Sequence, residues 1–116
     1  MAHSVLWAAA QHHLELMHQA LGDSELEHFP ASSGRLQQSV LRIRGGANLT
    51  VLKPRQEESS TILVTIFRPG VDQNAGAMSI GTEADLHRAY RLAEVPDRAL
   101  SALPVGRTVV TEHRMV

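Results

Sequence analysis

The sequence predicts an α+β fold of two layers, in which a three- to four-stranded, mainly antiparallel sheet carries helices on one face. Two observations lead to this prediction. Residues 35–68 contain three strand-like runs separated by turn signals, and the segments on either side show helical periodicity. The expected order is helix, three strands, helix, a further helical turn and a final strand, in one α+β domain over residues 1–116.

The composition is typical of a globular protein, with 43% hydrophobic and 20% charged residues among 116. No apolar run reaches the length of about 20 residues that spans a membrane. The N-terminal segment lacks the basic residues that open a secretory signal. The chain has no cysteine, which excludes disulfides and thiolate zinc sites and fits a reducing compartment. We therefore expect a cytoplasmic protein without membrane contact.

Residues 3–21 have the period of an amphipathic helix, and Gly22 is placed to end it. The apolar face consists of residues spaced three and four apart: Leu6, Ala10, Leu14, Met17 and Leu21. Ser24 and Glu27 have the spacing of a capping box, which predicts a short second helical turn. Residues 31–34 are expected to form a loop.

A hairpin is predicted around two consecutive glycines, with a three-residue loop at 45–47. This register pairs Arg44 with Asn48 and Ile43 with Leu49. It sorts the side chains into two faces, because neighbouring residues of a strand point to opposite sides. One face holds Leu41, Ile43, Leu49 and Val51, and the other holds Arg42, Arg44, Asn48 and Thr50.

The third strand, residues 61–67, is apolar on both faces, and its Phe67 is expected to join the arginines on the second face. Residues 69–81 are predicted as loop.

Thr82 and Asp85 have the spacing of a helix cap, which predicts a helix over 83–94. Further helical turns are predicted in 98–103, and a terminal strand is predicted in 107–116. The predicted core comprises Leu6, Leu14, Met17, Leu41, Ile43, Leu49, Val51, Val64, Ile66, Leu86 and Tyr90.

Charge is unevenly distributed along the chain, although the net charge is only −1. Residues 1–34 contain four acidic residues and no lysine or arginine, whereas residues 35–68 are mainly basic. One interpretation is a solvated surface with ion pairs between these segments, each worth about 0–1 kcal/mol. The other is a positive sheet face that binds an acidic partner.

No catalytic or cofactor motif is present, so we expect no cofactor and no catalytic residue that the sequence identifies, and an enzyme is the less favoured class. The favoured hypothesis is a non-enzymatic protein-binding module, such as a chaperone, adaptor, inhibitor or immunity-type protein. It would use the mixed arginine and apolar face, with Arg42, Arg44, Thr50 and Phe67 as the partner-binding residues. The expected partner is a protein, with an acidic protein as one option, and pairing of two copies into a homodimer is a further option.

Two alternatives come from other classes of function. The basic sheet could bind nucleic acid, although Phe67 is the only aromatic residue expected on it for stacking. A small metal-dependent or small-molecule enzyme could use His12, Glu15 and His18, whose spacing of three places them on one side of a helix. The competing interpretation of these three residues is a solvated polar face.

The order of elements is similar to two known layouts. Double-stranded-RNA-binding domains share the helix, three strands and helix, but they carry lysines at the start of the second helix, where this chain reads TEADLHRAYR. Class I type III secretion chaperones are similar in outline, which implies a protein-binding fold. This chain differs from them in its basic sheet and in its predicted terminal strand.

Overall fold

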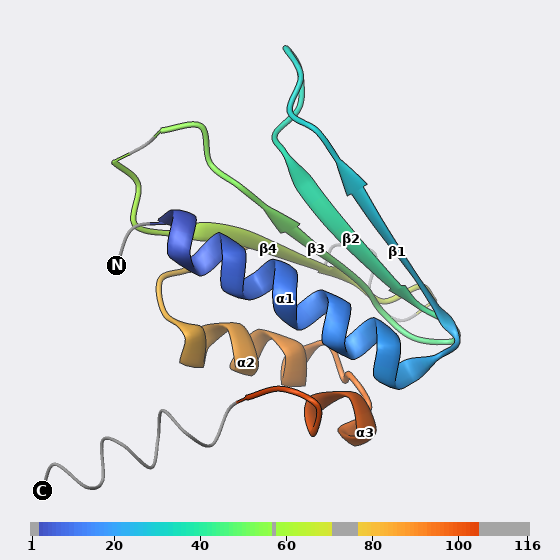
Figure 1. Cartoon of the computed structure of the whole chain (residues 1–116). Coiled ribbons are helices and arrows are strands. Elements are labelled where there is room, and N and C mark those ends of the chain that lie inside the picture. Colours follow the sequence, from blue (N-terminus) through green and yellow to red (C-terminus); the bar gives the residue numbers. More distant parts are fainter. Residues whose placement is uncertain (1–2, 57, 71–76, 105–116) are drawn as a thin grey trace, which may run out of the picture.

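Five strands and three helices make up the structure, a computed structural model that describes residues 3–56, 58–70 and 77–104. In chain order they are α1 (His3–Leu21), β1 (Ser24–Phe29), β2 (Gln38–Ile43), β3 (Asn48–Leu52), β4 (Ile62–Phe67), β5 (Ala77–Ile80), α2 (Glu83–Leu92) and α3 (Asp97–Leu100). Each strand pairs antiparallel with the next one along the chain. Figure 1 shows α1 lying along one face of the sheet, with α2 and α3 beside it.

Helix α1 has the predicted bounds, and its predicted apolar face is buried. Leu6, Ala10, Leu14 and Met17 are fully inaccessible to solvent. Gly22 ends the helix with φ +74°, and its N–H donates to the His18 carbonyl at 3.1 Å. Each large apolar side chain buried in this way contributes roughly 1.5–3 kcal/mol to the stability of the fold.

None of the helices in the described ranges is both long and apolar enough to cross a membrane.

The strands are covered on one face. In β3, Leu49 and Val51 are fully buried, whereas the residues between and beside them are half-exposed. This alternation follows from the two-residue repeat of a strand, which sends every second side chain toward the helices. All eleven residues predicted for the core are buried, and the α+β class with helices packed on an antiparallel sheet is confirmed.

The β2–β3 hairpin has a different register from the predicted one. Arg42 pairs with Asn48 and Leu41 with Leu49, so the three-residue loop spans 44–46 and not 45–47. Gly46 N–H donates to the Ile43 carbonyl at 2.9 Å, and Gly45 takes φ +72° at the third position of that turn, where glycine is favoured. The relative shift is two residues, which conserves the sorting of side chains between the faces.

The segment predicted as a second helical turn is instead strand β1. Ser24 and Leu26 face the helices, whereas Glu25 and Glu27 alternate with them on the other face. This two-residue alternation favours a strand, and pairing with β2 satisfies the backbone groups that a single helical turn would leave open. Glu25 then pairs with Arg42, the basic residue of β2.

Residues 69–81, predicted as loop, contain strand β5. Met78 pairs with Val64 and Ile80 with Ile62, so both side chains face the helices beside β4. With β1 and β5, the sheet has five strands and not three or four. The predicted terminal strand over 107–116 lies outside the described residues.

Helix α2 begins as predicted, because the Thr82 hydroxyl accepts a hydrogen bond from Asp85 N–H at 3.1 Å. It ends earlier than residue 94. Glu94 and Val95 N–H groups donate back to the Arg91 and Tyr90 carbonyls at 2.9 and 3.2 Å, the pattern of a Schellman motif. Glu94 therefore takes φ +60°, a conformation that favours glycine.

Replacing Glu94 tests this helix end. Both Glu94→Gly and Glu94→Ala remove the hydrogen bond from Arg68 to the Glu94 carboxylate. Only glycine relieves the left-handed backbone, so the glycine variant should be more stable than the alanine variant by about 1 kcal/mol. Urea unfolding of both variants measures the difference. Equal stability, or a more stable alanine variant, would contradict the helix end described here.

Candidate functional site

Four side chains form a polar cluster between α1 and α2, which we call the His–Glu–Tyr cluster: His13, Glu83, His87 and Tyr90. Glu83, His87 and Tyr90 are spaced four and three residues apart, so they share one face of α2. His13 is contributed by α1, where it is 1% exposed. The packing of α1 against α2 therefore brings these groups together.

His13 is the centre of the cluster. Its Nε2 lies 3.1 Å from Glu83 Oε2, and its Nδ1 lies 3.0 Å from the Tyr90 hydroxyl. An ionised carboxylate can only accept, so Nε2 carries the proton and Nδ1 accepts from the Tyr90 O–H. The ring centroids of His13 and His87 are 4.9 Å apart, and Tyr90 packs edge-on against both rings.

Burial keeps the cluster's rings uncharged. It lowers the pKa of His13 from 6.5, with a smaller lowering by His87 that opposes the raising effect of Glu83. It also lowers the pKa of His87. Burial of the phenol raises the pKa of Tyr90 well above its usual value. Both imidazoles are therefore neutral at pH 7, with ring nitrogens that can accept a proton or coordinate a metal ion.

The cluster contains the residue types that bind divalent transition metals. Ligand atoms of His13, Glu83 and His87 all lie within 4.8 Å of one another, which holds for no other group of three His, Cys, Asp or Glu residues in the described ranges. Two imidazole nitrogens and one carboxylate oxygen form a common ligand set for zinc and iron.

The residues that the sequence proposed as metal ligands lie elsewhere. His12 and Glu15 are exposed on α1, and His18 Nδ1 is hydrogen-bonded to the Ser24 hydroxyl at 2.6 Å. Sequence reasoning missed His87, for which no partner was evident. The signal was present in the four-residue spacing of Glu83 and His87, but His13 comes from a distant helix, and only the fold places it there.

A second candidate site is the sheet face opposite the helices, which we call the open face. Thr50 lies on it between Val40 and Thr65, and Asn48 lies between Arg42 and Phe67. No helix of the described residues covers this face. It is defined by the outward side chains of the five strands: Glu25, Glu27, Phe29, Gln38, Val40, Arg42, Asn48, Thr50, Leu52, Leu63, Thr65, Phe67, Ala77 and Ser79.

Three of the four predicted partner-binding residues, Arg42, Thr50 and Phe67, therefore share the open face. Arg44 does not, because it lies in the β2–β3 loop. There it lines a cleft of about 570 Å³ between the hairpin and the end of α2. Phe67 is 41% exposed, an unusual position for a phenyl ring.

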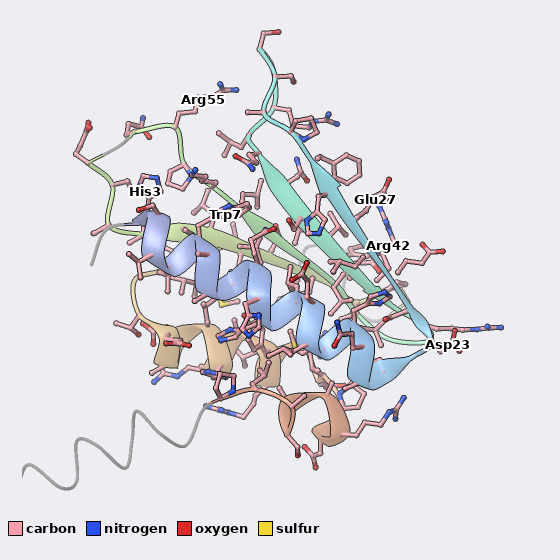
Figure 2. The ribbon with its side chains drawn as sticks, viewed as in Figure 1. His3, Trp7, Asp23, Glu27, Arg42 and Arg55 are labelled. Carbon is pink, nitrogen blue, oxygen red and sulfur yellow. The ribbon has the colours of Figure 1, made fainter. Side chains whose placement is uncertain are left out.

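The arginines of β2 and its loop are paired with acidic residues near β1. Arg42 donates to Glu27 at 2.7 Å, and Figure 2 shows the two side chains together at this edge of the sheet. Arg44 lies 3.5 Å from Asp23. Two of the four acidic residues in 1–34 are therefore paired with two of the basic residues in 35–68.

One serine has the contacts of a nucleophile. The Ser39 hydroxyl lies 2.7 Å from His28 Nδ1 and is also hydrogen-bonded by Gln11. However, Ser39 is only 1% exposed and faces α1. A substrate cannot reach this hydroxyl in the folded chain, so the arrangement serves the packing of α1 on the sheet.

Comparison of the chain with protein-family models, with curated proteins and with solved structures finds no match. Both candidate sites therefore rest on the geometry described above.

The lowered pKa values of His13 and His87 predict a pH-dependent stability. Between the lowered pKa values and 6.5, the unfolded chain binds more protons than the folded chain. The contribution of these two neutral histidines to the free energy of unfolding should therefore be complete above about pH 6.5. Below that pH, the free energy of unfolding should fall. His87→Gln should reduce this slope. Urea unfolding of both proteins in the presence of a chelator, from about pH 7 to pH 5, measures it. Identical slopes would contradict the burial of a neutral His87.

Proposed function

We propose that this chain is a non-enzymatic protein-binding module that holds an apolar segment of another protein on the open face. The observation that supports the proposal is the one-sided covering of the sheet. All three described helices lie on one side of the sheet, and the other face carries half-exposed threonine and leucine side chains together with the exposed Phe67. Exposed surfaces of this kind commonly mark interaction sites.

The size of the open face indicates what it can bind. Five strands spaced about 4.8 Å apart and about 17 Å long cover roughly 400 Å². A stable complex of two folded proteins buries about 800 Å² on each partner. The open face therefore fits one helix or one extended segment better than a whole domain, which suits a chaperone or an adaptor.

The chemistry of the open face favours an apolar partner segment over an acidic one. Arg42 already bonds Glu27, and Arg44 lies off this face beside Asp23. A nucleic acid would have to compete with these carboxylates for the same arginines, so the geometry lends no support to that alternative. Removal of Phe67 and Leu63 from water is the main favourable contribution that the open face offers.

Substitution of Phe67 tests the proposal, with Leu92 as a matched control. Both are exposed large apolar residues, at 41% and 56%, but Phe67 lies on the open face and Leu92 on α2. Phe67→Asp should weaken binding of the partner at least tenfold, because it introduces an unpaired charge into a surface that becomes buried. Leu92→Asp should bind as the native chain does.

The partner is obtained by affinity purification from the native host with mass spectrometry, and titration calorimetry measures its binding. Circular dichroism confirms that both variants fold. Sedimentation velocity of the chain alone detects a homodimer. If the two copies pair through the open face, a second copy of the chain occupies that face in place of the proposed partner segment. Equal affinities of the Phe67→Asp and native chains would contradict the proposal.

A further inference from the structure

The His–Glu–Tyr cluster lies on the helix side of the sheet and plays no part in the proposed docking. His87 is 6% exposed, yet its ring makes no hydrogen bond within the described part of the chain. Its ring lies 4.9 Å from that of His13. No fully buried side-chain nitrogen or oxygen of the described residues lacks a hydrogen-bond partner, so the ring nitrogens of His87 still reach solvent. A neutral imidazole in this position can offer a nitrogen to a metal ion.

We propose that His13, Glu83 and His87 bind a divalent transition-metal ion of the Zn²⁺ class, which links α1 to α2. Nε2 of His13, an imidazole nitrogen of His87 and the Glu83 carboxylate are the ligands. Carboxylate and imidazole are suitable ligands for Zn²⁺, Co²⁺ and Ni²⁺, whereas Mg²⁺ and Ca²⁺ prefer sites made only of oxygen.

The distances allow this site after a small movement. Two ligands of a tetrahedral zinc ion lie roughly 3.4 Å apart, given bonds of about 2.0–2.2 Å. His13 Nε2 and Glu83 Oε2 are already 3.1 Å apart, and all three ligand atoms lie within 4.8 Å. His87 can move toward the other two without breaking a hydrogen bond to any described residue.

Tyr90 is placed to orient His13 when the metal binds. The proton of the neutral His13 ring moves from Nε2 to Nδ1 through solvent, which frees the Nε2 lone pair and leaves the net charge unchanged. Nδ1–H then donates to the Tyr90 oxygen, now 3.0 Å away, as the hydroxyl hydrogen rotates aside. Metal-bound histidines generally use their second nitrogen in this way.

Glu83 leaves one side of the site open. Its side chain is 37% exposed, whereas that of His13 is 1% exposed. Three protein ligands leave a fourth coordination position for water, and this position lies on the Glu83 side.

The test measures Zn²⁺ binding to the full chain by titration calorimetry at neutral pH, after chelator treatment. The visible absorption of Co²⁺ reports the coordination of the ion. We expect one ion per chain, and at least tenfold weaker binding by Glu83→Gln and by His87→Phe, because each loses one ligand. Glu83→Gln alters a half-exposed side chain, and near-ultraviolet circular dichroism establishes that each variant folds.

His12→Gln/Glu15→Gln is the matched control, because it removes a histidine and a carboxylate from the exposed side of α1. This variant should bind Zn²⁺ as the native chain does. The proposal is overturned if the native chain binds no Zn²⁺, if the control loses binding, or if both cluster variants retain it. None of these results affects binding of a protein segment on the open face, so the two proposals fail separately.

Discussion

The structure depends on the burial of one face of α1 against one face of the sheet. Leu6, Ala10, Leu14 and Met17 supply the helix side of that contact, and every second residue of β2, β3 and β4 supplies the other. Since a strand presents its side chains alternately, this one contact decides the environment of almost every sheet residue. Half of them enter the core, and the other half form the open face.

The same contact creates the buried polar layer. Once α1 packs on the sheet, α2 lies beside it, and His13 meets Glu83, His87 and Tyr90. The hydrogen bonds of His13 offset part of the cost of removing these groups from water, and no fully buried side-chain polar atom of the described residues lacks a partner. A polar layer with so few alternative pairings also favours one arrangement of the two helices.

The sequence was informative where the signal was local and periodic. It predicted the bounds of α1, the cap of α2 and the two faces of β2 and β3. It did not predict β1 and β5, whose residues resemble a capping box and a small-residue loop until pairing with β2 and β4 is known. The hairpin register was displaced by two residues, a shift that side-chain alternation cannot detect. Arg42, Thr50 and Phe67 were placed on one face by that alternation, whereas the His–Glu–Tyr cluster joins residues about 70 positions apart.

The most direct test of the one-sided sheet uses the absence of cysteine from the chain. Single cysteines are introduced at Thr65 on the open face and at Ser39 on the covered face, and each variant is exposed to a maleimide as the native, monomeric protein. The structure predicts that Thr65→Cys, at a half-exposed position, reacts in the folded protein, and that Ser39→Cys reacts only when the protein unfolds. Equal protection of both thiols in the monomer would show that the second face is also covered, which would contradict the docking surface proposed here.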